Sequence, residues 1–446
     1  MSERSRTIGR ISQALGKKAL VWFGIRGEDA APYLAIPQFS ACFSIAAPLS
    51  SGALHDVVAL EQLTGHRVDL DQYDVDFDDD ARVLELRRRV LTALHRDSAL
   101  VTYRPSHFLS ATHFASLETC NYLGQFKDRQ LPFEHKPWVE TMLARVGVRT
   151  LPWRYVADEH RNVIRRDIER GPCILRPSHS SGGEGITLIE QPDDVDRLWP
   201  VRGDHLVSVA PYLSDAIPVN VGGCVFDAET VTLHPASVQL IGIPTCTSRQ
   251  FGYCGNDFAA IRAFSKPVLH ELTAISLTVG RWLAGQGYLG AFGIDYLVDD
   301  EVVYFTELNA RMQGSSAPAA QLSAQLGVSD LILDHLSAGL GLAPIAHRTL
   351  GDWADDLPDF AHVVVHNIEN RSVANTVGAF TVAPPARRLD LVPDAGLAID
   401  PGATLARLCF EEQVTSSGFE VSEHVDRAVA ALMRGVRATD SGRKGA

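Results

Sequence analysis

The sequence predicts an α/β protein, with α+β layering, that is built from several layers of strands and helices. Strand-like apolar runs alternate along most of the chain with segments whose apolar residues recur at helical spacing. A Ser/Gly-rich segment joins two strand-like runs, and a later strand pair carries carboxylate and amide side chains in an apolar region. These observations indicate a sheet-based protein whose ligand site is formed by a glycine-rich loop and a pair of strands.

Length and composition restrict the class of protein. The chain has 446 residues, of which 46% are hydrophobic and 21% charged, which is an ordinary globular mixture. Its formal net charge of −13 argues against a nucleic-acid-binding surface, because phosphate contacts need clustered Lys and Arg. There is no apolar run of about 18 residues, and the seven cysteines form no CxxC pair. We therefore expect a cytoplasmic protein that binds neither nucleic acid nor membrane.

The expected elements follow one another in strand–helix order. The N-terminal part predicts a small α/β layer from strands at 19–25 and 100–103 with a helix at 80–95. Further helices are expected at 136–146, 268–286, 316–338 and 423–436, and strands at 172–176, 186–190, 206–210, 219–227, 290–298 and 302–310. An apolar run occupies 361–369, a polar loop is expected at 242–257, and the tail at 439–446 is expected to fray.

The segment 171–190, GPCILRPSHSSGGEGITLIE, reads as a hairpin with a mobile Ser/Gly tip. Glycines let backbone amides approach a ligand closely, and successive N–H groups make a nest for an anion. The segment has neither GxxxxGK[ST] nor GxGxxG opening a helix, so it matches neither the P-loop nor the dinucleotide fingerprint. Taken alone, it is equally consistent with an ordinary surface hairpin.

The segment 290–311, GAFGIDYLVDDEVVYFTELNAR, predicts a metal site on two strands. In a regular strand Phe305, Glu307, Asn309 and Arg311 share one face. Carboxylate and amide oxygens suit a hard divalent cation, and the preceding strand offers Asp295. A three-residue loop at 299–301 would place Asp295 diagonal to Glu307 on one face, whereas a two-residue loop would reverse that parity. The alternative is a charged strand pair with solvated carboxylates.

These motifs together resemble the ATP-grasp superfamily, in which a glycine-rich hairpin covers the phosphates of ATP and an ExN strand motif holds Mg²⁺. The match covers about residues 136–321, and the whole chain resembles peptide ligases of the pheganomycin-biosynthetic type. The resemblance implies ATP and two Mg²⁺ ions, with Asp295, Glu307 and Asn309 as metal ligands. It implies Arg311 as the catalytic arginine at the transferring phosphoryl group. The implied nucleotide-binding residues are Lys136, Arg176, Ser180, Ser181, Gly182, Gly183, Gly185, Val209, Ala210, Pro211 and Tyr212.

The sequence departs from the superfamily pattern at three places. Arg176 stands where a lysine is usual, Asp295 replaces a glutamate, and the hinge VAPYL lacks the usual acidic residue. The loop 241–257 is expected to determine substrate specificity. In it, Arg249 is positioned to bind the carboxylate of an acid and Tyr253 to stack on an aromatic acid. An ordinary surface loop explains that segment equally well.

The resemblance implies an ADP-forming ligase that joins an amino acid to a peptide through an acyl phosphate. The acid would be a guanidino- or phenylglycine-type amino acid, and the acceptor the N-terminal amine of a peptide. The alternatives are an L-amino acid ligase that makes dipeptides, a small-molecule kinase and a non-catalytic nucleotide-binding protein. We expect a homodimer and four parts: a pre-ATP-grasp domain at 1–130, two ATP-grasp subdomains at 131–210 and 211–345, and a C-terminal domain at 346–446.

Overall fold

The computed structural model describes residues 1–49, 57–94, 97–107, 120–125, 127–200, 205–374, 387–391 and 397–443. The last three residues of the expected tail, 444–446, lie outside this part. Among the helices that are described, none is long and apolar enough to cross a membrane.

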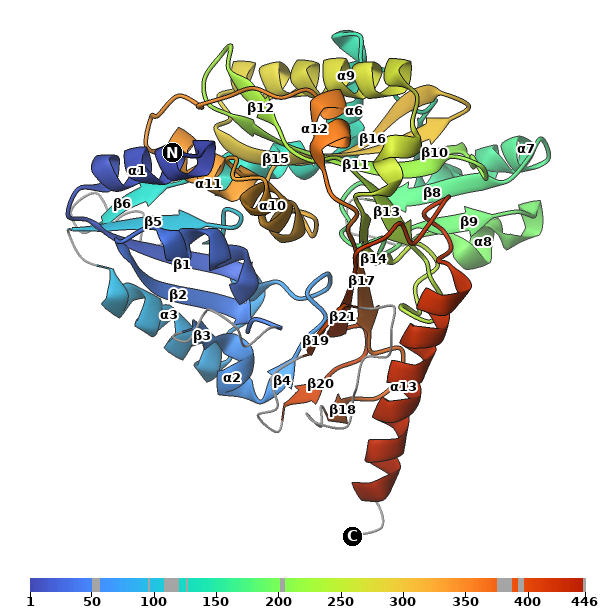
Figure 1. The fold of residues 1–446 in the computed structure, drawn as a ribbon. Helices are drawn as coiled ribbons and strands as arrows, with labels where there is room; N and C mark the ends of the chain where they lie inside the picture. Colours follow the sequence, from blue (N-terminus) through green and yellow to red (C-terminus); the bar gives the residue numbers. More distant parts are fainter. Residues whose placement is uncertain are drawn as a thin grey trace.

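The small α/β layer predicted from the strand–helix–strand order forms, and its sheet is parallel (Figure 1). Among the described residues its strand order is β3-β2-β1-β5-β6. Helix α3 begins after Asp80, whose side chain accepts a hydrogen bond from the backbone N–H of Arg82, and its buried residues have the spacing of one helix face. The elements are α1 (Glu3–Leu15), β1 (Ala19–Arg26), β2 (Phe39–Ala46), β3 (Val57–Ala59), α2 (Leu60–Thr64), α3 (Ala81–Ala93), β5 (Ser98–Thr102) and β6 (Cys120–Leu123).

A small antiparallel sheet carries the Ser/Gly hairpin. Its order is β7-β10-β8-β9 in the described part of the chain, and the antiparallel pairing of β8 with β9 confirms the predicted hairpin. Short helices lie between these strands (Figure 1). The elements are α5 (Lys127–Gln130), α6 (Lys136–Arg145), β7 (Arg154–Ala157), α7 (Arg165–Ile168), β8 (Cys173–Pro177), β9 (Thr187–Ile189), α8 (Val195–Leu198) and β10 (Leu206–Pro211).

The largest sheet runs from the proposed metal strands into the C-terminal region. Over the described residues its order is β16-β15-β11-β13-β14-β17-β21-β19, with β12 paired to β11. It therefore continues across the boundary expected at residue 345. The elements are β11 (Ile217–Val225), β12 (Val231–Leu233), β13 (Ser237–Ile241), β14 (Tyr253–Asp257), α9 (Lys266–Gly285), β15 (Gly290–Asp299), β16 (Val302–Asn309), α10 (Ser316–Gln325), α11 (Leu331–Gly339), α12 (Leu350–Asp356), β17 (Ala361–His366), β19 (Arg388–Leu391) and β21 (Thr404–Phe410).

A small sheet joins the N-terminal layer to the C-terminal region. Strand β4 (His66–Arg67) of the N-terminal layer pairs with β20 (Ala398–Ile399), which pairs with β18 (Val373–Ala374). Helix α13 (Glu423–Arg443) extends from this end of the molecule (Figure 1). The N-terminal layer is thus hydrogen-bonded to the C-terminal region.

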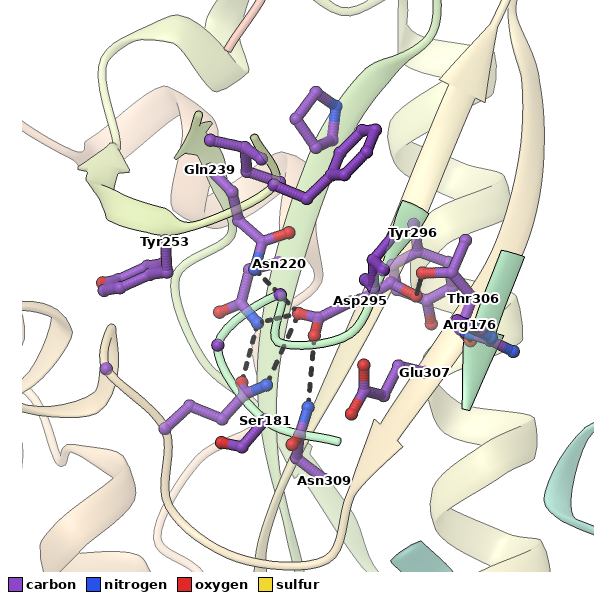
Figure 2. A pocket seen from close by; sticks show the side chains of 18 of the residues that line it. Arg176, Ser181, Asn220, Gln239, Tyr253, Asp295, Tyr296, Thr306, Glu307 and Asn309 are labelled. Atoms are coloured by element: carbon purple, nitrogen blue, oxygen red, sulfur yellow. Dashed lines mark hydrogen bonds between the residues drawn. The ribbon is translucent and has the colours of Figure 1, made fainter. Parts of the chain in front are cut away.

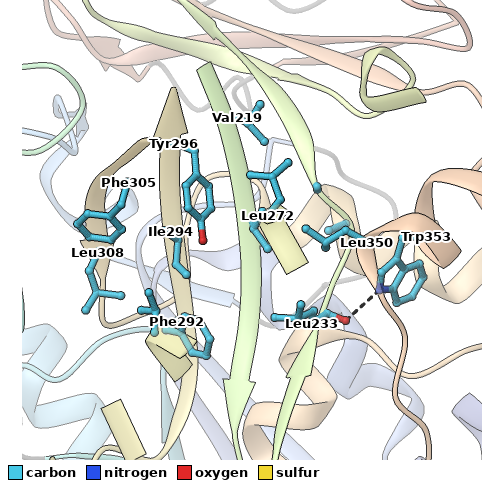
Figure 3. Close-up of a cluster of buried hydrophobic side chains, with 14 of the residues drawn as sticks. Val219, Leu233, Leu272, Phe292, Ile294, Tyr296, Phe305, Leu308, Leu350 and Trp353 are labelled. Atoms are coloured by element: carbon cyan, nitrogen blue, oxygen red, sulfur yellow. Dashed lines mark hydrogen bonds between the residues drawn. The ribbon is translucent and has the colours of Figure 1, made fainter. Parts of the chain in front are cut away.

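The two faces of β15 have different surroundings. Asp295 points from one face into a cleft (Figure 2), whereas Ile294 and Tyr296 belong to the main hydrophobic core on the other (Figure 3). Helix α9 covers this core, and its Ser276 hydroxyl lies 2.8 Å from the Tyr296 hydroxyl. The core fixes the direction of the strand, so the polar residues between the core residues face the cleft.

Three expectations about elements were wrong. The helix expected at 316–338 is two helices, α10 and α11, separated by a turn at Gly327, whose φ is 70°. The last residues of the polar loop expected at 242–257 form strand β14, which pairs with β13 on one edge and with β17 on the other. The tail is helical to Arg443, because α13 continues beyond the expected end at 436.

Candidate active site

The turn between β15 and β16 has two residues. Asp300 and Glu301 have φ angles of 43° and 64°, so both adopt the left-handed conformation of a type I′ hairpin turn. Asp299 pairs with Val302 across the turn. The predicted three-residue loop is therefore wrong.

A β-bulge at Thr306 offsets the shorter turn. Tyr296 pairs with Phe305, but the next residue, Asp295, pairs with Glu307, so Thr306 is an extra residue on β16. Asp295 thus lies directly opposite Glu307 rather than diagonal to it, and both line the cleft (Figure 2). Phe305 does not share the face of Glu307 as regular alternation predicted. It is fully buried in the core, because the bulge reverses the alternation after it.

Four carboxamide groups surround the Asp295 carboxylate. Asn220 Nδ2 donates to Asp295 Oδ1 at 2.7 Å, and Gln239 Nε2 and Gln313 Nε2 donate to the same oxygen at 3.1 and 3.4 Å. Asn309 Nδ2 donates to Oδ2 at 3.1 Å (Figure 2). Sequence reasoning missed the first three amides, because they come from separate segments that only the folded sheet brings together.

The carboxylates of Asp295 and Glu307 face each other in the cleft. Burial and the facing Glu307 carboxylate raise the pKa of Asp295 from 3.8 to about 7. A cation between the two carboxylates would relieve this repulsion. Within the described residues, no group of three or more His, Cys, Asp and Glu side chains could hold a metal ion. A bound Mg²⁺ would therefore use Asp295, Glu307 and the amide oxygen of Asn309, and Asn309 would have to turn its amide to present that oxygen.

Lys136 connects the acidic strands to the Ser/Gly hairpin. It is the first residue of α6, and its Nζ lies 3.1 Å from Glu307 Oε1. The same Nζ donates to the carbonyl oxygen of Ser180 at 2.8 Å. Burial lowers the pKa of Lys136, while Glu307 acts in the opposite direction. The lysine expected to bind nucleotide thus stands where the hairpin meets the proposed metal ligands.

The tip of the hairpin needs its glycines. Gly182, Gly183 and Gly185 have φ angles of 56°, 76° and 72°, a region that side-chain-bearing residues rarely adopt. A Cβ atom at Gly183 would also overlap the carbonyl oxygen of Phe251. Ser181, Gly182 and Gly183 line the cleft. The loop therefore lies close to the acidic pair with its backbone exposed to the cleft.

Arg176 is held by three different contacts. It forms an ion pair with Glu140, its Nη1 donates to the carbonyl oxygen of Thr306 at 2.6 Å, and its Cζ lies 3.9 Å from the ring centroid of Trp153. Burial lowers the pKa of Arg176 to about 10, against the effect of Glu307. Trp153 and Glu140 were not predicted, because an aromatic residue and a helix acid carry no motif of their own.

The hinge residues lie at the end of β10. Val209 pairs with Arg154, the first residue of β7, and the pairing with β7 ends there. Ala210 and Pro211 therefore keep pairing only with β8. Pro211 and Tyr212 line the cleft, while Val209 and Ala210 are buried. The edge of the hinge on the β7 side is therefore unpaired in the sheet at Ala210 and Pro211.

Arg311 lies between the acidic strands and the N-terminal half of the cleft. Its Nε donates to Glu134 Oε1 at 3.3 Å. Burial acts to lower the pKa of Arg311, but Glu134, Tyr103, Glu307 and Asp71 outweigh it and raise that pKa. Arg311 is thus a fixed positive charge in the cleft.

The two residues expected to bind substrate have different surroundings. Tyr253 lines the cleft, and its hydroxyl donates to the Asn256 side chain. Arg249 forms ion pairs with Asp69 and, at 3.1 Å, with Asp71. An incoming acid would have to compete with these carboxylates for Arg249.

Most of the candidate residues line one cleft of about 310 Å³, whereas Lys136, Ser180, Gly185, Val209, Ala210 and Arg249 are not among the residues that line it. The N-terminal layer, the hairpin sheet and the central sheet all contribute to its walls. One half contains Trp153, Arg176 and the hinge, and the other contains Tyr103, Tyr253 and Arg311 around the acidic pair.

Known proteins share this architecture. No family model matches the sequence. The formate-dependent phosphoribosylglycinamide formyltransferase of Pseudomonas aeruginosa is 28% identical over 275 residues, which cover 59% of this chain and 63% of that enzyme. The chain thus spans less than two thirds of the length of this curated relative.

Solved structures resemble nearly the whole chain. The N5-carboxyaminoimidazole synthase of Aspergillus clavatus, in complex with ADP and 5-aminoimidazole ribonucleotide, has a TM-score of 0.59 and 13% identity, covering 94% of this chain and 99% of that one. The biotin carboxylase domain dimer of Hydrogenobacter thermophilus 2-oxoglutarate carboxylase, with MgADP and bicarbonate, has a TM-score of 0.58 and 15% identity, covering 88% and 86%. These likenesses show the fold of the chain, which is the ATP-grasp fold.

Proposed function

We propose that the protein is an ATP-dependent carboxylate–amine ligase that works through an acyl phosphate. The observation that carries this proposal is the meeting of Asp295, Glu307 and Asn309 with Lys136 and the glycine loop in one cleft. Bound ATP with Mg²⁺ would supply the phosphoryl group and neutralise its charge. The related formyltransferase is, by its name, an enzyme that uses formate, a carboxylate.

The residues of the chain would position the reactants and stabilise the charge that develops during phosphoryl transfer. Asp295, Glu307 and Asn309 would hold the metal, and Lys136 and Arg176 would bind the phosphates. The glycine loop would close over them and exclude water that hydrolyses the intermediate. Arg311 would bind the carboxylate and stabilise the charge that develops as its oxygen attacks phosphorus. An amine then replaces phosphate at the activated carbon.

The finer assignment is an amino-acid–peptide ligase of the pheganomycin-biosynthetic type. The acid would be a guanidino- or phenylglycine-type amino acid, and the acceptor the N-terminal amine of a peptide. Tyr253 and Tyr103 provide aromatic surface in the substrate half of the cleft, which suits an aryl side chain. A homodimer is part of the proposal, in keeping with the related carboxylase domain, which is a dimer.

The test is an ATP-dependent coupling assay. Phenylglycine, arginine and formate serve as acids, and glycinamide and triglycine as amines, with ADP, phosphate and amide product all measured. Hydroxylamine in place of the amine should trap the acyl phosphate as a hydroxamate. ADP release with a phosphorylated acid but without hydroxamate or amide would indicate a kinase instead. Nucleotide binding without any ADP release would indicate a non-catalytic protein.

Two variants connect this chemistry to the assigned residues. Glu307→Gln removes one charge from the proposed metal site, and Arg311→Ala removes the cation at the reacting carboxylate. Each should fold and lose turnover by about 100-fold or more. Thr278→Ala, at a half-buried position of α9 that does not line the cleft, is the matched control and should leave turnover unchanged. Wild-type turnover in both site variants would refute the assignment.

A further inference from the structure

Asp71 is a carboxylate that lines the cleft, and the proposed function assigns it no role. It follows β4 in the N-terminal layer and lines the cleft. Its side chain is 31% exposed, and Arg249 Nη1 donates to its Oδ2 at 3.1 Å. Because a Cβ atom at Gly182 would overlap the Asp71 carboxylate, this carboxylate lies directly against the glycine loop.

Asp71 shares the cleft with Arg311. It is one of the groups that raise the pKa of Arg311, the arginine proposed to hold the reacting carboxylate. The other carboxylates that line the described cleft are Asp295 and Glu307. Asp295 is enclosed by amides and Glu307 pairs with Lys136, and both are assigned to the metal. Asp71 is the remaining carboxylate of the described cleft, and it belongs to the N-terminal layer.

The arginines around this half of the cleft already have acidic partners. The pairs are Arg26 with Asp29 (3.2 Å), Arg104 with Asp74 (3.8 Å), Arg407 with Glu28 (2.7 Å), and Arg249 with both Asp69 and Asp71. Binding a phosphate monoester here would require one of these pairs to separate, at the cost of an unpaired carboxylate. A cationic acceptor can instead share the Asp71 carboxylate with Arg249, whose Nη1 contacts only its Oδ2 among the described contacts. The charge balance therefore favours an amine without a phosphate group.

We propose that Asp71 binds the ammonium group of the acceptor and takes its proton. This inference rests on the proposed ligase function. An ammonium ion has no lone pair, so one N–H proton must move to Asp71 Oδ before attack. The amine nitrogen then forms a bond to the acyl carbon while the C–O bond to phosphate breaks. The leaving phosphate takes the electron pair and the second proton, and Asp71 returns its own proton to solvent.

The test compares two nucleophiles on Asp71→Asn. Glycinamide enters largely as an ammonium ion near pH 7, whereas hydroxylamine is already unprotonated there. The acid is whichever of phenylglycine, arginine and formate gives wild type the most hydroxamate. We expect Asp71→Asn to lower amide formation about 100-fold near pH 7 while hydroxamate formation stays within about threefold of wild type. The deficit should shrink to below about tenfold near pH 9, where the amine is free without a base.

Asp69→Asn is the matched control. Asp69 shares Arg249 with Asp71, so its variant weakens the same ion-pair cluster without changing the carboxylate that lines the cleft. It should keep both products near wild-type rates. Equal loss of amide and hydroxamate in Asp71→Asn would mean that Asp71 only shapes the glycine loop, and tighter ATP binding with unchanged amide formation would make it a latch on that loop. Either result would overturn the proposal, whereas failure of the ligase function itself would show as no hydroxamate from wild type.

Discussion

Replacing Glu140 by leucine should destabilise the hairpin sheet far more than replacing it together with Arg176. Both side chains of this ion pair are almost fully buried, with 1% and 5% exposure. Glu140 Oε2 also accepts a hydrogen bond from the Tyr155 hydroxyl at 3.0 Å. Glu140→Leu would leave the guanidinium buried without its counter-charge, which costs about 3–5 kcal/mol.

The double variant Glu140→Leu/Arg176→Leu removes both charges. A buried pair replaced by apolar residues costs little by itself. The variant still loses the stacking of Arg176 on Trp153 and its bond to the carbonyl of Thr306, about 1 kcal/mol each. We therefore expect it to be at least about 1–2 kcal/mol more stable than Glu140→Leu alone.

Amide hydrogen exchange of β8 and β10 measures this locally, without assuming that the whole chain unfolds in one step. A loss of about 3 kcal/mol corresponds to exchange about 150-fold faster in these strands. The peptides of β1 and β5 in the N-terminal sheet serve as an internal control and should exchange at the wild-type rate. An acceleration below about fivefold in Glu140→Leu, or a double variant that exchanges faster still, would refute this reasoning.

Further predictions concern the acidic pair and the glycine loop. The pKa of Asp295 is raised from 3.8 to about 7, so protonated Asp295 stabilises the folded state fully below about pH 4, and this stabilisation is lost as the pH rises to about 7. Urea titrations over this pH range measure the free energy of unfolding. Wild type should show this loss, and Asp295→Asn should not. For the same reason Mg²⁺ affinity should fall about tenfold per pH unit below about pH 7, which calorimetry with an ATP analogue would detect and a flat profile would contradict. Gly183→Ala should weaken ATP binding at least tenfold, because its φ is 76° and its Cβ would collide with Phe251, while Gly147→Ala, with φ 87° and open space around it, should cost only about 1 kcal/mol of stability and no affinity. Chelating Mg²⁺ with EDTA should abolish ADP release and leave the melting temperature of the nucleotide-free protein unchanged, whereas a metal-dependent melting temperature would indicate a structural ion.

The order of elements was readable because periodicity and glycine clusters are local signals. The hairpin at 171–190 and the strand pair at 290–311 both form as predicted. The register of the second pair was not readable, since two deviations from regularity cancel each other. A two-residue turn at Asp300 and Glu301 reverses the parity, and the bulge at Thr306 restores it.

Contacts between segments far apart in the chain could not be predicted from the sequence. Asn220 and Gln239 are ordinary strand residues until the sheet places them beside Asp295. Arg249 was read as a substrate ligand from its loop alone, and its ion pairs depend on Asp69 and Asp71, which lie about 180 residues earlier in the chain.

The path of the central sheet determines how the protein can be divided. Val363 and His362 of β17 pair with Gly255 and Asn256 of β14, and β4 of the N-terminal layer depends on β20 for a partner. A protein shortened after residue 345 would keep every proposed ligand of ATP, yet would leave an open row of backbone amides and carbonyls along β14. Such a bare edge recruits strands from other molecules. The C-terminal hundred residues therefore cover the edge of β14, and residues 1–345 expressed alone should aggregate rather than form a soluble nucleotide-binding protein.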